Sequence, residues 1–393
     1  MFSISYSWMR RLDVWLGKPL AALVGSFTHR SASLYGDRAV TSVPKKILCT
    51  QFIGLGSVIL SLPMLRSLKE KGVQIAFCSF EGQAEIVKMT GLADEILIIR
   101  PTVWELIPSL FKSWRAVRKF KPDVFIDLEP VSHFSALMGR FSGAETRLGF
   151  HCGRPLRENL FTHLVAFSSE RHRIENIQLF LKRLGLSVQG ESEFPAPPSL
   201  DRVRNTMPEM PSRKRVVVNI NSGDLNHARM WPEAHWVQLC DKLLEDTLVD
   251  LVFSGSSDER DRVQSLMANL KDPTRVFNMA GSVTLIELLR LISDAELVVS
   301  VESGIMHLAA WMKTPLMALF GPETPKLHAP LSKSAKTLWA GLPCSPCVNV
   351  FSERGIRCGD FQCMKAITPD LAYQTCLALK TAGPSKENKP RVA

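Results

Sequence analysis

From Lys45 onward, short runs of β-branched and other apolar residues alternate with amphipathic stretches, and this alternation limits the possible folds more than any other feature. Alternating strand and helix patterns are typical of parallel βα units, in which each helix crosses back over the sheet. A proline-rich stretch interrupts the pattern, which then begins again. The predicted strands are 46–50, 74–79, 95–99 and 124–128 before the interruption, and 215–220, 249–254, 297–301 and 316–320 after it.

The repeat of the pattern predicts two doubly wound, Rossmann-like α/β domains joined by a linker. Ligands of such sheets bind beyond the carboxyl ends of the strands. We therefore expect the two domains to face each other across a cleft that holds the active site. The last helix is a candidate to pack back on the first domain. The expected segments are an N-terminal segment 1–44, a first domain 45–186, a linker 187–214, a second domain 215–380 and a disordered tail 381–393.

The N-terminal segment is basic and amphipathic. The chain has 48 Lys+Arg and 38 Asp+Glu, a net charge of +10, and residues 1–46 hold seven basic and two acidic side chains. Half of the surplus therefore lies in the first eighth of the chain. Trp8 and Trp15 share an apolar face with several leucines, while the cations lie mostly off that face, which favours attachment to a membrane surface. Gly17 and Pro19 predict two short helices rather than one.

Two alternatives remain for this segment. A basic start followed by an apolar run could be a secretory signal peptide, cut near Ala32. An amphipathic helix can also simply pack on the protein's own surface. No stretch of the chain approaches the roughly 18 uncharged apolar residues of a membrane-spanning helix.

The segment 297–320 carries the strongest chemical signal. A buried strand ends at Val301 and turns directly into a helix that begins near Ile305. The backbone N–H groups of a helix start favour an anion, and Ser303 and His307 can add a hydroxyl and an imidazole on the same side. The segment is thus a candidate cradle for a diphosphate. Alternatively, Ser303 only caps the helix.

A second segment, 219–236, runs from a strand end through a polar loop to a helix that starts after Pro232. Arg229 in this loop can pair with a phosphate oxygen. The alternative, which is the more common role of an arginine beside a tryptophan, is a surface stacking pair with Trp231.

Together with the turn Gly54-Leu55-Gly56-Ser57, the motifs ARMWPEAHW and VESGIMHLAAWMKTPLMALFGPETP resemble glycosyltransferase family 9. The resemblance extends from about Lys45 to about Thr368. Members of this family are bacterial heptosyltransferases that build the lipopolysaccharide inner core from ADP-heptose. The resemblance implies a GT-B fold, a donor held mainly by the second domain, inversion at the anomeric carbon and no metal requirement.

The resemblance also implies roles for single residues on the donor side. Arg229 stands where the family commonly has a lysine that contacts the donor phosphate, and Glu259 falls near the acidic residue expected to bind the adenosine ribose. Glu302 replaces the usual aspartate of the diphosphate motif. The implied donor-binding residues are Arg229, Glu259, Glu302, Ser303, Gly304, Ile305 and His307.

On the acceptor side the chain departs from the family. Many members have an aspartate where this chain has Ser57, and that aspartate is the proposed general base. A hydroxyl is a poor base, because general base catalysis needs a group that titrates near the working pH. Asp127 and Glu129 are the candidate replacements, and the alternative is that both are structural acids. A chain without a base would instead be a non-catalytic nucleotide- or lipid-binding protein of the same fold.

The acceptor-side residues that we expect are Gly54, Gly56, Ser57 and Arg147. Arg147 belongs to a group with Arg140, Arg154 and Arg157 that could bind a phosphorylated, lipid-linked sugar. A solvated basic face is the alternative. The basic residues are not interleaved with stacking aromatics, so we expect no nucleic-acid partner. The expected partners are a nucleotide sugar, a lipid-linked saccharide and the inner face of the cytoplasmic membrane.

Four of the nine cysteines are close together in the sequence. Their spacing is typical of a structural zinc site, although the second pair is wider than usual. A disulfide in an exported protein and free thiols are the alternatives. The four residues are Cys344, Cys347, Cys358 and Cys363.

Overall fold

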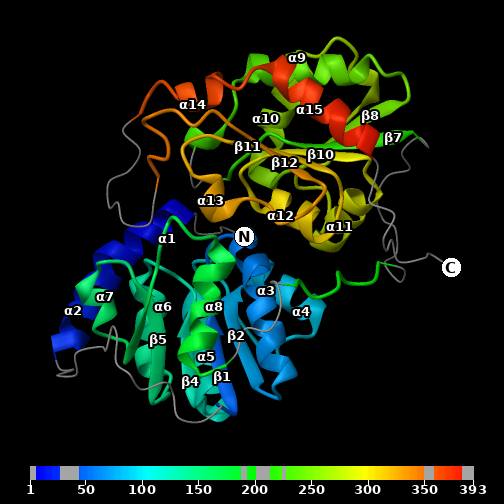
Figure 1. Ribbon diagram of the computed structural model, residues 1–393. Coiled ribbons are helices and arrows are strands. Elements are labelled where there is room, and N and C mark those ends of the chain that lie inside the picture. Colours follow the sequence, from blue (N-terminus) through cyan, green and yellow to red (C-terminus); the bar gives the residue numbers. More distant parts are fainter. Residues whose placement is uncertain are drawn as a thin grey trace. The chain divides into compact units, whose positions relative to one another are not determined.

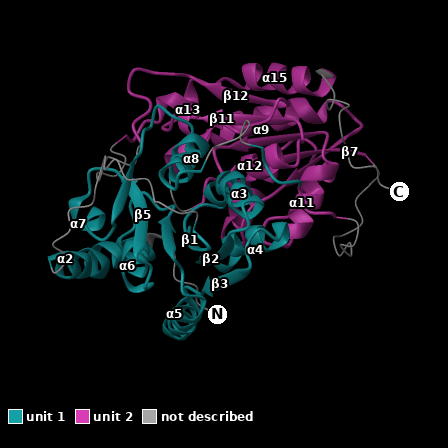
Figure 2. Cartoon of the chain, turned by 60° about the horizontal axis from the view of Figure 1, so that its bottom comes forward, with its two compact units in different colours: residues 1–196 teal, residues 197–393 magenta. Residues whose placement is uncertain are grey.

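The chain forms two compact units, residues 1–196 and 197–393 (Figures 1 and 2). Residues 383–393 of the predicted tail and parts of the predicted linker fall outside the residues that the structure describes. Residues 381 and 382, which the sequence assigned to the tail, instead end the last helix. The structure is a computed structural model that describes residues 6–26, 44–186, 193–200, 213–223, 227–348 and 358–382.

The first unit is built on a parallel six-stranded sheet with the strand order β3-β2-β1-β4-β5-β6. Every neighbouring pair in this sheet is parallel, so the carboxyl ends of all six strands lie at one edge. The central strands are buried on both sides, which explains their continuous apolar runs. The strands are β1 Lys46–Thr50, β2 Gln74–Phe80, β3 Glu95–Ile99, β4 Val124–Asp127, β5 Thr146–His151 and β6 His163–Ala166.

Helices cover both faces of this sheet (Figure 1). On one face α3 packs against α4 and α8. On the other, α2, α5 and α6 share one hydrophobic cluster with the sheet. The helices are α3 Leu55–Glu70, α4 Glu81–Thr90, α5 Leu106–Phe120, α6 His133–Phe141, α7 Pro155–Glu158 and α8 Arg173–Arg183.

The second unit repeats this architecture with the strand order β12-β11-β10-β7-β8-β9, again all parallel. Its strands are β7 Lys214–Asn219, β8 Val249–Phe253, β9 Val276–Asn278, β10 Leu297–Val301, β11 Leu316–Phe320 and β12 Ala335–Trp339. Its longer helices are α9 Glu233–Leu244, α10 Arg260–Met267, α11 Leu285–Asp294, α12 Gly304–Trp311 and α15 Pro369–Ala382.

The fold class predicted from the sequence is confirmed, and all eight predicted strands are present. Four further strands carry little sequence signal. β6 has only four residues and β9 only three. β12 is a half-exposed edge strand. In β5 the apolar run is interrupted by Arg147 and Gly149. Edge strands need no continuous apolar run, because only part of their surface is buried.

Residues 6–26 pack on the first unit. They form one uninterrupted helical run of α1 Tyr6–Leu12, a π-helical turn η1 Asp13–Gly17 and α2 Lys18–Ser26, so Gly17 and Pro19 do not separate two helices as predicted. Asp13 accepts hydrogen bonds from the backbone N–H groups of Phe134 (2.7 Å) and His133 (3.1 Å) at the start of α6. These bonds and the salt bridge to His133 hold the pKa of Asp13 below its usual value, although burial by itself would raise it.

One side of this segment nevertheless stays exposed, with Trp15 at 78% and Leu16 at 66%. None of the described helices is long and apolar enough to span a bilayer.

The last helix, α15, packs against α9 and strands β10 to β12 of its own unit. The tryptophan of the ARMWPEAHW motif joins this packing, because Trp231 Nε1 donates to the carbonyl of Ile367 at 2.9 Å. Trp231 is only 1% exposed. It is therefore a core residue, and the alternative in which Arg229 and Trp231 form a surface stacking pair is wrong.

Candidate active site

Polar side chains gather at the carboxyl edge of the second sheet, after four adjacent strands. They follow β11, β10, β7 and β8, which are neighbours in that order. The carboxyl edge is where ligands of doubly wound sheets bind. All the donor-side residues predicted from the sequence lie on the loops or helix starts at this edge.

Ser303 stands at the start of α12 and caps it. Its Oγ accepts hydrogen bonds from the N–H of Ile305 (3.3 Å) and from Asn219 Nδ2 (2.9 Å), which comes from the neighbouring strand β7. Ser300 lies within hydrogen-bond distance of the same hydroxyl, at 3.0 Å. Ser303 therefore caps the helix, which leaves its predicted contact with a diphosphate untested. Gly304 and Ile305, both half-buried, form the first turn of the helix, and the buried His307 follows.

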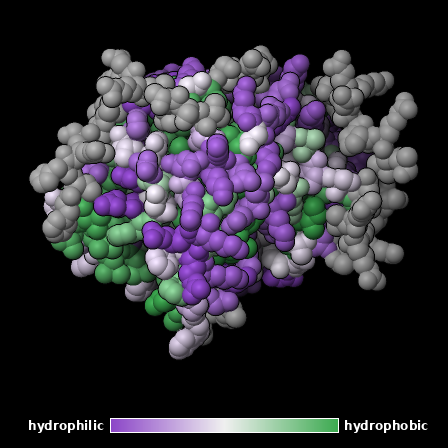
Figure 3. All heavy atoms as spheres, turned by 90° about the horizontal axis from the view of Figure 1, so that it is seen from below, coloured by the Kyte–Doolittle hydropathy of each residue, from purple (hydrophilic) through white to green (hydrophobic). Residues whose placement is uncertain are grey.

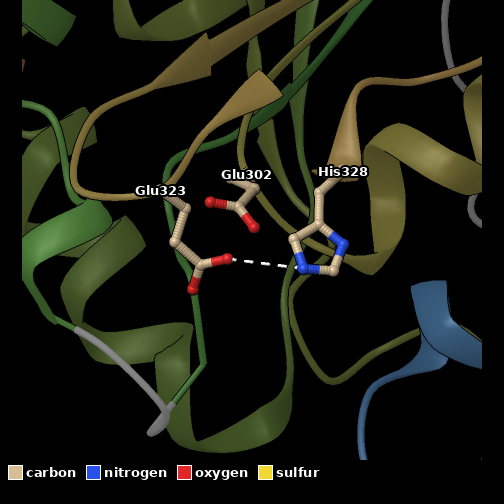
Figure 4. Close-up of side chains that lie close together, drawn as sticks. All are labelled: Glu302, Glu323 and His328. Atoms are coloured by element: carbon tan, nitrogen blue, oxygen red, sulfur yellow. Dashed lines mark ion pairs between the residues drawn. The ribbon is translucent and has the colours of Figure 1, made fainter. Parts of the chain in front are cut away.

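Arg229 lies between two buried glutamates. Its Nε is 3.4 Å from Glu302 Oε2, and its Nη2 donates a short hydrogen bond to Glu323 Oε1. Glu323 also forms an ion pair with His328, at 3.5 Å. Figure 4 shows Glu302, Glu323 and His328 pointing toward one another, with the Glu323–His328 pair dashed. This network brings together the ends of β10 and β11 and the loop after β7.

The two glutamates of this network have opposite pKa shifts. Burial raises the pKa of Glu302 well above its usual value, and the charge of Glu323 opposes the lowering by Arg229. Burial would also raise the pKa of Glu323, but Arg229 and His328 lower it. Two buried carboxyl groups so close cannot both ionise easily. The charged form is therefore favoured at Glu323, beside Arg229 and His328, and the neutral form at Glu302.

Among the described residues, one group of acids and histidines has the spacing of a metal site. Glu302, Glu323 and His328 each offer a ligand atom, and these atoms lie within 4.8 Å of one another. Arg229, however, already supplies a positive charge to both carboxyl groups. The same three side chains therefore also belong to an ion-pair network centred on Arg229.

Glu259 ties two neighbouring loops together. Its carboxylate accepts from the N–H of Ser256 (2.8 Å), which completes a capping box, and from the N–H of Gly223 (3.2 Å). Nearby, two buried polar atoms, Asn221 Nδ2 and Ser254 Oγ, have no hydrogen-bond partner in the described part of the chain. Buried polar groups are almost always satisfied in native proteins. This part of the edge therefore offers hydrogen bonds to a ligand.

The carboxyl edge of the first unit holds Glu129, which follows β4. Its Oε1 accepts three hydrogen bonds, from Phe52 N (2.6 Å), Ile53 N (2.7 Å) and Gln51 Nε2 (2.7 Å). Burial raises the pKa of Glu129 to about 7, and the charge of Asp127 adds to the increase. A carboxylate that titrates near pH 7 has the property that a general base needs.

Asp127, the other candidate base, is fully engaged. It is completely buried and pairs with the equally buried Arg157 at 2.8 Å. It also accepts from Thr50 Oγ1 (3.1 Å), Ser135 Oγ (2.8 Å) and the N–H of Glu129 (3.0 Å). The structure thus gives Asp127 the contacts of a structural acid. It also places Arg157 in the core, which excludes it from a basic surface group.

The turn that carries Ser57 connects β1 to α3 at the same edge. The backbone of Gly54 has φ +80°, a conformation that residues with a side chain rarely adopt. The N–H of Ser57 donates to the carbonyl of Gly54 at 3.1 Å. The loop residues just before this turn are those that Glu129 holds. Gly54, Gly56, Ser57 and Glu129 are therefore brought together.

Arg147 is not part of this group. It is the second residue of β5, at the amino edge of the sheet, and its guanidinium donates to the carbonyls of Leu160 (3.0 Å) and Ala144 (2.9 Å). Because the strands are parallel, the amino edge is opposite the edge that holds Gly54 and Glu129. The expectation that Arg147 lies with the acceptor-side residues is wrong.

All nine cysteines are free thiols. Cys344, Cys347 and Cys358 are exposed, and Cys363 is buried. Among the described residues these four sulfurs do not form a group within 4.8 Å, unlike the Glu302 group. Burial raises the pKa of Cys363, and the nearby thiols of the other three raise it further.

Sequence reasoning missed Glu323, His328 and Gln51. Glu323 lies in the motif GPETP, within the segment that carries the family resemblance, and it is the third residue after the carboxyl end of a predicted strand. That position is a usable signal, since carboxyl ends of adjacent strands meet at one edge. Gln51 directly follows the predicted strand 46–50 and carries the same signal. His328 carries none, because only packing places it beside Glu323.

Comparison with known proteins agrees with this geometry. The model of glycosyltransferase family 9 (heptosyltransferase) matches residues 110–354. Lipopolysaccharide heptosyltransferase 1 of Pseudomonas aeruginosa is 25% identical over 331 residues, covering 77% of this chain and 86% of the relative.

Two solved structures share the fold. The structure of E. coli ADP-heptose LPS heptosyltransferase II has a TM-score of 0.69 at 21% identity and covers 86% of this chain and 99% of that chain. E. coli heptosyltransferase WaaC with ADP-2-deoxy-2-fluoro heptose has a TM-score of 0.63 at 19% identity and covers 85% of this chain and 99% of that chain.

The two parallel six-stranded α/β units have the GT-B-like fold of these heptosyltransferases. The match to the family model spans more than half of the residues, so the chain belongs to glycosyltransferase family 9.

Proposed function

We propose that this enzyme transfers a heptose, with inversion and without a metal ion, from ADP-heptose to a lipopolysaccharide core or a related cell-envelope glycolipid. The single observation that carries the proposal is the network of Arg229, Glu302 and Glu323 beside the start of α12. A metal-free transferase must stabilise the charge that develops on the departing diphosphate by other means. A helix N-terminus with an adjacent arginine can do so.

On the donor side, the backbone N–H groups at the start of α12 and Arg229 would hold the diphosphate. Ser303 would keep the helix start in place through its cap, and His307 lies one turn further on. The unsatisfied atoms of Asn221 and Ser254 support a nucleoside at the neighbouring loops, where Glu259 would meet the ribose.

On the acceptor side, Glu129 would take the proton of the attacking hydroxyl. Its pKa of about 7 suits this role, and the glycines of the Gly54–Ser57 turn leave room for the sugar to approach. The acceptor oxygen would form the new bond to the anomeric carbon as the bond to the diphosphate breaks. The proton would go to Glu129 and the negative charge to ADP.

A lipid-linked acceptor implies that the enzyme works at a membrane, and we place it at the inner face of the cytoplasmic membrane. The exposed side of α1 and α2 supports attachment through the N-terminal segment. The exposed apolar residues of this side are Trp8, Trp15, Leu16, Leu20 and Leu23.

The proposal is tested by mixing the purified full chain with single nucleotide sugars and following thermal unfolding. We expect ADP-heptose to raise Tm, because a ligand that binds only the folded state stabilises it. UDP-glucose and GDP-mannose serve as controls and should leave Tm unchanged. ADP release should then require both ADP-heptose and a lipopolysaccharide core acceptor. A Tm shift with UDP-glucose alone, or release that is independent of acceptor, would contradict the proposal.

A further inference from the structure

Helix α5 of the first unit carries a row of exposed large apolar side chains. Trp104, just before the helix, is 84% exposed, Ile107 76%, Phe111 57% and Trp114 47%. Their spacing of three, four and three residues places them along one side of the helix. The opposite side is buried and includes Val117 and Phe120. We call Trp104, Ile107, Phe111 and Trp114 the α5 ridge.

Cations surround this ridge. The guanidinium of Arg115 lies 5.7 Å from the ring centre of Phe111, and that of Arg118 lies 5.9 Å from the ring centre of Trp114. Residues 103–121 contain one acidic side chain and five basic ones, and all five basic side chains are exposed. Exposed aromatic residues among exposed cations combine apolar and positive contacts on one surface. The basic residues are Lys112, Arg115, Arg118, Lys119 and Lys121.

The ridge lies on the same face of the first sheet as the N-terminal helices. Residues of α2, α5 and α6 belong to one hydrophobic cluster with that sheet. Figure 2 shows these helices on one side of the unit, away from α3 and α4. In Figure 3, which views the molecule from below, hydrophobic residues gather over α2 at the left and over α5 at the lower edge. Two apolar stripes are thus available to a single flat partner.

We propose that the α5 ridge binds the surface of an anionic lipid bilayer. The charge decides among possible occupants, because five cations around an apolar row match anionic headgroups above acyl chains. Amphipathic tryptophans are also favoured at the boundary between headgroups and hydrocarbon. A second copy of this chain would instead bring the same cations face to face, which is unfavourable.

The position of α5 gives this surface a consequence for catalysis, which rests on the proposed function. The ridge begins just after β3, at the carboxyl edge of the sheet. The Gly54–Ser57 turn and Glu129 lie at this same edge. A bilayer held against the start of α5 therefore lies beside the edge at which we place the lipid-linked sugar.

The test measures co-sedimentation of the full chain with vesicles of phosphatidylcholine alone or of phosphatidylcholine with phosphatidylglycerol. We expect binding to the anionic vesicles, and the ridge variant Trp104→Ser/Ile107→Ser/Phe111→Ser should bind them at least about tenfold more weakly. The matched control Leu248→Ser/Leu331→Ser/Leu371→Ser changes exposed leucines of the second unit and should bind normally. Unchanged Tm in both variants would show that each is folded.

A charge variant and salt separate the electrostatic contribution. Lys112→Gln/Arg115→Gln/Lys119→Gln should lose binding to anionic vesicles only, and added salt should weaken wild-type binding. A parallel variant, Trp8→Ser/Trp15→Ser/Leu16→Ser, measures the N-terminal stripe separately.

Three outcomes would overturn the inference. They are a ridge variant that binds like the control, a wild-type chain that binds neither vesicle, and a wild-type dimer that the ridge substitutions dissociate. Transfer from ADP-heptose is measured in the same preparations. Ridge-dependent binding without any transfer would refute the proposed function and leave the membrane surface standing.

Discussion

The two units share one strand order, which makes β4 and β10 equivalent strands, yet the acids at the carboxyl ends of these strands are bonded differently. At the end of β4, Asp127 pairs with a fully buried arginine, and Glu129, two residues further on, accepts backbone N–H groups. After β10, Glu302 faces Arg229, which is also held by Glu323. The first unit therefore uses arginine to fix its fold and leaves one acid with a pKa of about 7. The second keeps an arginine beside a helix start.

The difference shows that equivalent edges of one scaffold can carry acids in different surroundings, which the proposed function uses for two kinds of chemistry. A carboxylate can act as a proton acceptor only if a direct ion pair does not cancel its charge. Among the described residues, Glu129 has no such ion pair. An anion site needs a cation that is fixed but still near the surface of the site, and Arg229 meets this condition. Four substitutions or titrations test the comparison, from the largest expected effect to the smallest.

Glu129→Gln should abolish most transfer while donor binding survives. Removing a general base lowers rates by roughly 100-fold to 10,000-fold. The amide oxygen of glutamine can still accept from Phe52 and Ile53, so the loop should keep its place. ADP release measures the rate and ADP-induced change in Tm measures binding. Unchanged turnover would remove Glu129 from the mechanism.

Asp127→Asn should destabilise the first unit rather than stop the chemistry. It leaves Arg157 buried and unpaired, which costs about 3 to 5 kcal/mol in comparable sites. Urea unfolding measures the loss. Asp250→Asn is the control, because Asp250 is buried but its partner Arg213 is largely exposed, and its effect should be much smaller. Equal losses would contradict the structural role of Asp127.

Arg229→Met should weaken ADP binding by about 10-fold to 100-fold, the usual value of hydrogen bonds to a charged group. Arg229→Lys keeps the charge but not the two-sided contact with Glu302 and Glu323, so it should have an intermediate effect. Isothermal titration with ADP measures both. Full affinity in the methionine variant would show that the helix start alone holds the diphosphate.

The transfer rate should rise with pH through about 7, changing by about tenfold per unit on the acid side, because Glu129 must lose its proton to act. Stability should respond in the opposite direction. Between pH 4.5, the ordinary pKa of a glutamate, and about pH 7, the folded state keeps the Glu129 proton while the unfolded state loses it. The contribution of Glu129 to the free energy of unfolding therefore falls as the pH rises through that window. Rates and Tm across this range measure both trends, and Glu129→Gln should flatten them.

Much of the donor side was readable from the sequence, because its signals are local. A buried strand followed by Glu302-Ser303-Gly304 and an apolar helix is contiguous, and both the strand and the cap stand where the pattern predicts them. The acceptor side was harder. Arg147 is close in sequence to three other arginines, and the prediction grouped it with them. Its position near the start of β5 places it at the amino edge of the sheet, opposite the carboxyl edge that holds Glu129.

The sequence by itself determined that this chain forms two doubly wound units, since the alternation of strand and helix patterns is local and repeated. It also determined the helix start at which we propose that the donor binds. Only the tertiary structure decided how the charges are shared. Whether an acid is a base or a structural partner depends on what packs against it, and the contacts of Asp127 with Arg157 and of Glu323 with Arg229 join residues 30 and 94 positions apart. Burial and such long-range contacts set pKa values, and no local pattern encodes them.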